Sequence, residues 1–103
     1  MKICIIGYGK MGKMVEKIAI SKGHSINQII DSPNDKVDGN ADVAIIFSTP
    51  ESAVLNIMKC FEKKLPVVCG TTGWLNDIEK IKKYCETNTC TFLFSPNFSL
   101  GVN

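Results

Sequence analysis

Apolar residues along the chain follow two different patterns. Unbroken apolar runs occupy Ile3–Ile6, Val43–Phe47 and Pro66–Cys69, and such runs predict short strands that are buried on both faces of a parallel sheet. The first of these strands is predicted over Lys2–Ile6. Two further strands are predicted over Ser25–Ile30 and Thr89–Phe94. Because Ser25–Ile30 is more polar than the first run, we expect it near the edge of the sheet.

Between these runs, apolar residues recur every three or four positions, which predicts helices. The first predicted helix ends at Gly23, a residue that suits a left-handed cap. One face of this helix is expected to lie in the core, and it carries Met11, Met14, Val15, Ile18 and Ala19. A second helix is predicted to start with Thr49 as N-cap and Pro50 in the first turn, and a third covers residues 75–81.

Alternating strands and helices predict an α/β fold with one parallel sheet. Residues 32–42 are polar and hold no apolar period, so we expect an irregular crossover there rather than another strand and helix. Right-handed crossovers then predict a doubly wound sheet of about five strands in the order 2-1-3-4-5. Ligands bind such sheets beyond the carboxyl ends of the strands where the order reverses, which is between the first and third strands here.

The first strand leads directly into a glycine-rich loop, Gly7-Tyr8-Gly9-Lys10-Met11-Gly12, and a helix is predicted to follow. In such a Gly-x-Gly-x-x-Gly loop, the first glycine allows a sharp turn, the second admits a pyrophosphate to the backbone, and the third lets the helix pack against the strand. The N–H groups at the start of the helix face the phosphates. A tight turn without a ligand is the alternative, but one glycine would suffice for it. The loop therefore predicts a Rossmann-type sheet that binds a dinucleotide cofactor.

Asp31 follows the second predicted strand, nineteen residues beyond Gly12. At that spacing an acidic residue binds the adenosine ribose hydroxyls of NAD, and its charge repels the 2′-phosphate of NADP. Ser32 stands where an arginine would favour NADP, while Lys10 and Lys36 are candidate compensating charges. We therefore expect NADH to be favoured over NADPH. The alternative is a plain turn aspartate in a loop sequence.

Three more loops are predicted at the edge of the sheet that holds the glycine loop. Ser48 and Thr49 follow the third strand, and Gly70-Thr71-Thr72-Gly73 follows the fourth. Two glycines around two hydroxyls suit the lining of a cofactor crevice, and an ordinary loop with a threonine cap is an equal alternative. Trp74 is expected to cover the next helix rather than to stack on a ligand. The last strand is broken by Ser95-Pro96-Asn97-Phe98.

Composition narrows the classes of partner. The net charge is +2 and no basic stripe is interleaved with aromatic residues, which argues against nucleic acid. No apolar run has the length of a membrane span or of a signal peptide, so no membrane partner is expected. Five cysteines without a Cys-x-x-Cys pair indicate reduced thiols in a cytoplasmic protein. With His24 as the single histidine, read as a loop residue, neither a metal site nor a catalytic residue is expected.

Four motifs occur in this order and spacing: the glycine loop, Phe47-Ser48-Thr49-Pro50, Gly70-Thr71-Thr72-Gly73, and Ser95-Pro96-Asn97-Phe98-Ser99-Leu100-Gly101-Val102-Asn103. Together they resemble the N-terminal part of the dihydrodipicolinate reductase family over essentially the whole chain. The resemblance implies the reduction of a cyclic diacid with NADH or NADPH on the diaminopimelate route to lysine. It also implies cofactor contacts at Gly7–Gly12, Asp31, Gly70–Thr72 and Ser95–Phe98.

The family's substrate domain, with its His-His-x-x-Lys and Pro-Ser-Gly-Thr motifs, lies downstream of the last residue of this sequence. That domain also supplies the interface of the family's homotetramer. We therefore expect residues 1–103 to form an isolated cofactor-binding domain that is inactive by itself. An uncovered apolar last strand would favour self-association. A non-enzymatic NAD(P)-binding or redox-sensing module is the alternative.

Overall fold

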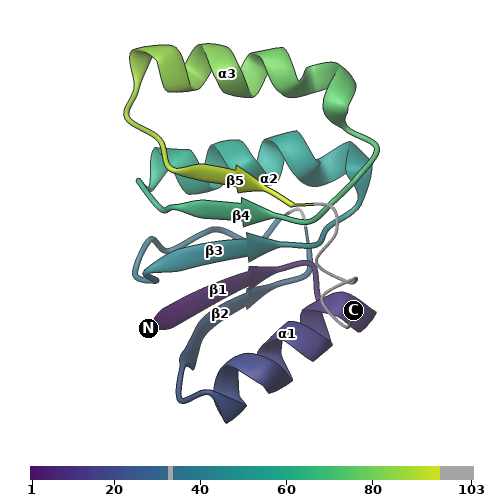
Figure 1. Cartoon of the computed structure of the whole chain (residues 1–103), viewed down its shortest axis with the longest axis vertical. Helices are drawn as coiled ribbons and strands as arrows, with labels where there is room; N and C mark the ends of the chain where they lie inside the picture. Colours follow the sequence, from purple (N-terminus) through teal and green to yellow (C-terminus); the bar gives the residue numbers. More distant parts are fainter. Residues whose placement is uncertain (33, 96–103) are drawn as a thin grey trace.

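The computed structural model describes residues 1–32 and 34–95, so the predictions for Pro96, Asn97 and Phe98 lie outside the described residues. Its five strands form one parallel sheet in the order β2-β1-β3-β4-β5, as predicted (Figure 1). The strands are β1 (Lys2–Ile6), β2 (Ser25–Ile30), β3 (Val43–Ile46), β4 (Val67–Cys69) and β5 (Phe92–Phe94). The more polar β2 lies at an edge and pairs with β1, which confirms its predicted position.

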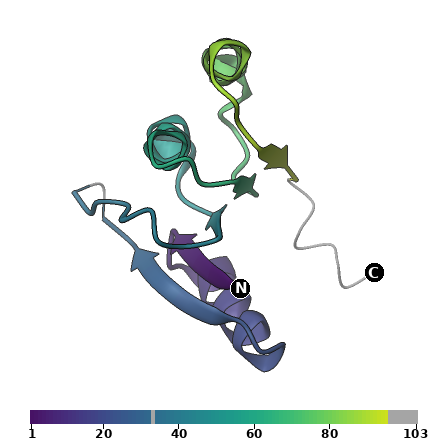
Figure 2. The same cartoon turned by 90° about the vertical axis from the view of Figure 1, so that its left-hand side faces the viewer.

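Helices cover both faces of the sheet: α1 (Lys10–Ser21), α2 (Pro50–Glu62) and α3 (Ile78–Thr87), with a 3-10 turn η1 (Leu75–Asp77) before α3. The larger core joins α2 and α3 to one face, and Figure 2 shows these two helices together on one side of the sheet. The smaller core lies under α1 on the other face, where Ile3 and Ile5 of β1 contact Ala19. The crossover before β3 holds no helix or strand among its described residues, as predicted.

Two predicted strands were too long, and the third predicted helix differs in its first turn. The last strand begins at Phe92 rather than Thr89, because its partner β4 has only three residues and Val67 pairs with Phe92. Similarly, β3 ends at Ile46, one residue before the predicted end. The predicted third helix opens with a 3-10 turn, and the α-helix itself begins at Ile78.

The predicted core face of α1 was wrong for two residues. Met14 is 45% exposed and Ile18 is 48% exposed. The buried stripe instead runs through Gly12, Val15 and Ala19, because α1 packs mainly on the two strands β1 and β2 and approaches them through small residues. The apolar period located the helix correctly. It could not predict which part of the broad apolar face of α1 would pack on β1 and β2, because these two strands cover only part of that face.

Trp74 lies in the core between β5 and the loop after β4, which supports its predicted covering role. It is 2% exposed, and its indole N–H donates a hydrogen bond to the Thr71 carbonyl at 2.6 Å. Its ring meets those of Phe92 and Phe94 edge-on. On the same strand Leu93 is 56% exposed, so an apolar side chain does face solvent at this edge; the self-association predicted from it stays a prediction.

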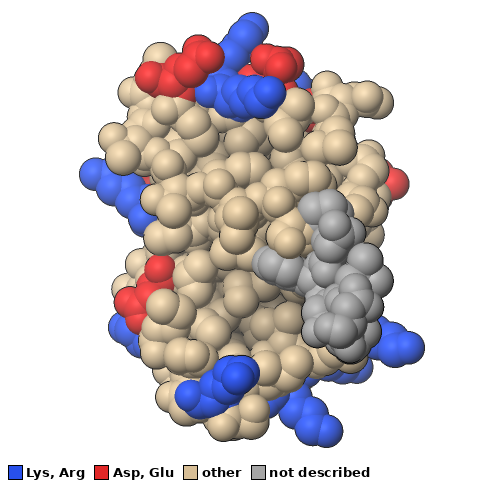
Figure 3. Space-filling view, viewed as in Figure 1, with Lys and Arg blue, Asp and Glu red and all other residues tan. Residues whose placement is uncertain are grey.

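Within residues 1–32 and 34–95, no helix is long and apolar enough to cross a membrane. The same part of the chain holds no cluster of three or more histidine, cysteine, aspartate or glutamate residues that could hold a metal ion. Figure 3 shows one face of the molecule, on which charged side chains lie mainly at the two ends and the rim while uncharged side chains fill the middle.

The buried thiols predict a loss of stability at alkaline pH. Burial raises the pKa of Cys4 from 9.0 to about 11 and that of Cys60 from 9.0 to about 12. The folded protein therefore holds these protons more tightly than the unfolded chain, so the stabilisation is complete below pH 9 and is lost as the pH rises toward the folded pKa values. Urea unfolding should give a free energy that is lower at pH 11 than at pH 9 by at least about 1 kcal/mol. A Cys60→Ala variant should show a shallower fall, and an unchanged slope would contradict this assignment.

Candidate functional site

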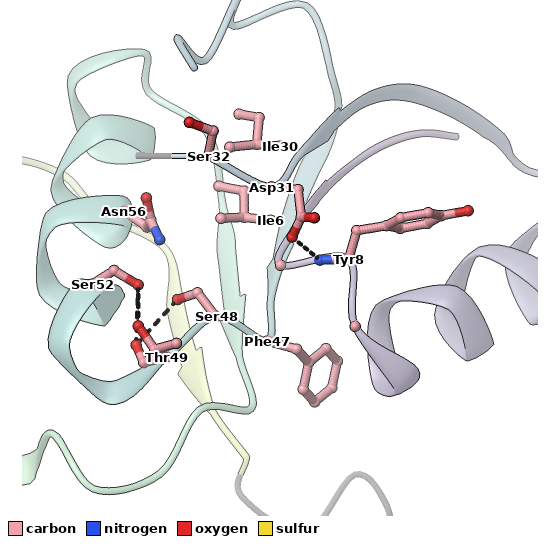
Figure 4. Close-up of a pocket in the computed structure, with 12 residues that line it drawn as sticks. Ile6, Tyr8, Ile30, Asp31, Ser32, Phe47, Ser48, Thr49, Ser52 and Asn56 are labelled. Atoms are coloured by element: carbon pink, nitrogen blue, oxygen red, sulfur yellow. Dashed lines mark hydrogen bonds between the residues drawn. The ribbon is translucent and has the colours of Figure 1, made fainter. Parts of the chain in front are cut away.

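A cavity of about 450 Å³ lies beyond the carboxyl ends of β1, β2 and β3 (Figure 4). This is where the strand order reverses, as the sequence predicted. The size falls within the range of small-molecule sites. Its lining residues come from three strand ends and from one face of α2: Ile6, Gly7, Tyr8, Gly9, Ile30, Asp31, Ser32, Phe47, Ser48, Thr49, Ser52 and Asn56.

Two glycines of the loop are required by the packing of the protein itself. Gly7 has φ +94°, and a Cβ atom there would stand 2.3 Å from the Phe47 carbonyl oxygen. At Gly12 a Cβ atom would stand 2.1 Å from the Gly7 carbonyl oxygen. The first glycine therefore makes the turn and the third lets α1 approach β1, as the motif predicts.

The middle glycine has no such structural reason. Gly9 has φ −84°, which any residue adopts, and a Cβ atom there would meet no atom of residues 1–32 and 34–95 within 4 Å. The open space lies beside the cavity, which Gly9 lines. A glycine is needed at this position only if something outside the described protein atoms approaches the backbone.

Gly9 is also the N-cap of α1, and this helix end is left open for an anion. No side chain caps it, and its first turn holds no acidic residue. Lys13 N–H is the first to bond within the helix, to the Gly9 carbonyl at 3.0 Å, so the N–H groups of Lys10, Met11 and Gly12 have no partner within α1. These N–H groups and the positive helix dipole favour a bound phosphate.

Asp31 lies across the cavity at the end of β2 and is exposed. Its Oδ1 atom accepts a hydrogen bond from the Tyr8 N–H at 3.0 Å, which joins the glycine loop to the end of β2. A second link runs from the Gly7 N–H to the Ile30 carbonyl at 2.7 Å. Across residues 1–32 and 34–95, neither Lys10 nor Lys36 forms an ion pair with this carboxylate. Asp31 is therefore held in place with its charge available to a ligand.

The Tyr8 side chain does not enter the cavity. Its hydroxyl donates a hydrogen bond to Glu16, and the ammonium of Lys13 lies 5.5 Å from its ring centroid. The hydrogen bond to Glu16 raises the pKa of Tyr8, so the phenol stays neutral at ordinary pH. Figure 4 shows the ring directed away from the opposite wall, so Tyr8 offers the cavity its backbone.

Ser48 and Thr49 line the cavity at the end of β3. Thr49 occupies the predicted N-cap position of α2, with Pro50 next to it, but its side chain makes no hydrogen bond to the helix backbone. Its hydroxyl instead lies 2.9 Å from the Ser52 hydroxyl. The cap position is therefore confirmed, and the expected capping hydrogen bond is absent because the hydroxyl pairs with Ser52.

Gly70, Thr71 and Thr72 lie outside the lining of this cavity. A Cβ atom at Gly70 would stand 2.2 Å from the Phe47 ring, so Gly70 makes room for that ring. The Thr71 hydroxyl donates to the Ser48 carbonyl at 3.1 Å. Thr72 is exposed. The loop thus supports the β3 end of the cavity from behind, and direct contact with a cofactor stays a prediction.

Ser95 is placed at the end of β5, where its N–H donates to the Cys69 carbonyl at 2.9 Å. Two polar residues of α2 that line the cavity, Ser52 and Asn56, were not predicted from the sequence. The sequence did contain a pattern that indicates them. Both residues are polar and four positions apart, so they lie on one face of the helix, next to the apolar stripe of α2.

Residues 21–98 match the family described as "Dihydrodipicolinate reductase, N-terminus". Among curated proteins, the chain is 43% identical to the 4-hydroxy-tetrahydrodipicolinate reductase of Christiangramia forsetii over 106 positions. Identity to proteins of the same name is 38% for Staphylococcus carnosus and 32% for Archaeoglobus fulgidus. Each match covers 100% of this chain but 44%, 46% and 48% of the relative, so the chain spans somewhat less than half the length of these relatives.

Proposed function

The chain belongs to the dihydrodipicolinate reductase family, and we propose that residues 1–103 are the NAD(P)H-binding domain of a 4-hydroxy-tetrahydrodipicolinate reductase. The reaction would be reduction of a cyclic diacid in lysine biosynthesis by the diaminopimelate route. The substrate would be held by the part of such an enzyme that lies outside the matched stretch. This domain's task would be to bind and orient the cofactor. A cytoplasmic homotetramer belongs to the same proposal.

The observation that carries this proposal is the space at Gly9. No packing within the described protein requires a glycine there, and a pyrophosphate at that point would meet the open N-terminus of α1. Lys10, Met11 and Gly12 would offer it their backbone N–H groups. When bound, the dinucleotide supplies the hydride and the protein supplies its position.

The two ends of the cofactor would lie over different strands. Asp31 would hold the adenosine ribose at the β2 end of the cavity, where the Tyr8 N–H already fixes the carboxylate. The nicotinamide half would extend toward the ends of β4 and β5. Contacts are proposed there for Gly70, Thr71, Thr72 and Ser95, with Ser48 and Thr49 between the two halves and Pro96, Asn97 and Phe98 beyond Ser95.

We expect Asp31→Ala to weaken NADH binding by about tenfold or more, because a hydrogen bond to a charged group contributes about 1.5–3 kcal/mol. The same change should affect NADPH less, because it also removes the charge that repels the 2′-phosphate. Isothermal titration calorimetry of both cofactors would measure this. Glu86→Ala is the matched control: it also removes one carboxylate, and Glu86 is exposed on α3 and does not line the cavity.

The proposed function fails if neither NADH nor NADPH binds to the unaltered chain. If both bind but Asp31→Ala and Glu86→Ala behave alike, the cofactor site stands and the ribose contact is wrongly assigned.

A further inference from the structure

Two polar side chains are buried in the described part of the protein, Asn56 and Thr71, each 6% exposed. Thr71 is accounted for, because its hydroxyl donates to the Ser48 carbonyl. Asn56 has no hydrogen-bond partner among residues 1–32 and 34–95, and since no fully buried side-chain nitrogen or oxygen in that part of the chain lacks a partner, its amide must be open to the cavity. The small part of Asn56 that is accessible faces the cavity, which it lines from α2.

This amide is unusual for its place in the helix. Its neighbours on the buried side of α2, Ala53, Ile57 and Cys60, are apolar and fully buried. An amide at the edge of an apolar helix face is placed to bond whatever occupies the cavity beside it. Nothing in the packing of α2 calls for an amide here, so its partner is expected in the cavity.

The position of Asn56 identifies which part of a dinucleotide it would meet. The phosphate position is at Gly9 and the ribose position at Asp31, so the base would lie beyond Asp31 in the remaining part of the cavity. Figure 4 shows Asn56 projecting from α2 toward Ile6 and Ile30, with Asp31 on the far side of them. The base would thus lie against two apolar side chains, with the amide at its edge.

We infer that Asn56 recognises the adenine of the cofactor, an inference that rests on the proposed function. Its carboxamide oxygen accepts a hydrogen bond from the 6-amino group, and its NH₂ group donates to the ring nitrogen N7 on the same edge. A carboxamide suits this edge because it carries a donor and an acceptor side by side, as in the pairing of asparagine with adenine in DNA. Ser52 does not have this role, because its hydroxyl is already bonded to Thr49.

The test compares NADH with reduced nicotinamide hypoxanthine dinucleotide, in which a carbonyl oxygen replaces the 6-amino group. We expect the unaltered chain to bind NADH about tenfold more tightly than the analogue, because the replaced group cannot donate to Asn56. In Asn56→Leu, which keeps the size of the side chain, the ratio of the two dissociation constants should fall to about one. Leu55→Ala is the matched control: Leu55 is 51% exposed on the same helix, outside the cavity lining, and its loss should leave the ratio unchanged.

A second measurement needs no ligand. Since the Asn56 amide has no hydrogen-bond partner among residues 1–32 and 34–95, Asn56→Leu should not lower the melting temperature of the protein alone. A merely structural asparagine would instead leave the variant less stable and the ratio of dissociation constants unchanged, and that pair of results would overturn the inference. Should Asn56→Leu fail to fold, the ratio measured on Asn56→Ala decides in the same way.

The outcomes separate the two proposals. Equal binding of both dinucleotides by the unaltered chain overturns the role of Asn56 and leaves cofactor binding intact. Binding of neither dinucleotide overturns the proposed function, and the inference about adenine with it.

Discussion

Gly9→Ala is expected to weaken NADH binding by about 30-fold while the protein stays folded. The new Cβ atom meets no atom of the described part of the chain within 4 Å, and φ −84° suits alanine, so the fold should accept it. The cost should appear when a pyrophosphate approaches the backbone, since an extra carbon in a close contact costs about 2 kcal/mol, or roughly 30-fold in affinity.

Two measurements test this expectation. Titration calorimetry gives the loss of affinity, and urea unfolding should show a loss of stability of no more than about 1 kcal/mol, the size of an N-cap effect. Unchanged affinity in Gly9→Ala would mean that the glycine loop is a turn without a ligand, which would remove the observation that carries the proposed function.

Gly12→Ala is expected to have the opposite profile, with a large loss of stability. Within a helix, alanine would ordinarily stabilise by up to about 1 kcal/mol relative to glycine. Here its Cβ atom would stand 2.1 Å from the Gly7 carbonyl oxygen and 3.5 Å from Ile5, and the nearest of these atoms is backbone that cannot turn aside. We therefore expect α1 to be displaced from β1, at a cost of about 3 kcal/mol.

Urea unfolding of Gly12→Ala beside Gly9→Ala makes a matched comparison, because the same methyl group is added three residues apart. A gain in stability for Gly12→Ala would contradict the close approach of α1 to β1. Similar stability for both variants would contradict the separate roles given to the two glycines.

The sheet order was predictable because its determinants are local. The glycine loop marks the end of β1, and the polar crossover leaves no room for another strand, so few topologies remain. The position of the cavity follows from the same facts. The buried face of α1 was less predictable, since Met14 and Ile18 continue an apolar period that the narrow contact with β1 and β2 does not use.

The residues that line the cavity could not all be predicted, because contacts between residues far apart in the sequence decide which side chains reach it. Asn56 follows Leu55 and precedes Ile57 on a helix whose period points to core packing, and only the folded structure turns its amide toward the ends of β1 and β2. The loop after β4 presents the reverse case. Its glycine and threonine suggest a ligand, but Gly70 and Thr71 are occupied by Phe47 and Ser48, which lie far from them in the sequence.

The edge position of β2 links local motion to ligand binding. Among residues 1–32 and 34–95 this strand pairs with β1 alone, and it carries Asp31 at its end. A ligand that spans Asp31, the glycine loop and α2 would contact both strands of that pairing. Any local unfolding of the strand would then require dissociation of the ligand, so occupancy of the cavity would slow hydrogen exchange along β2 more than along the central β3.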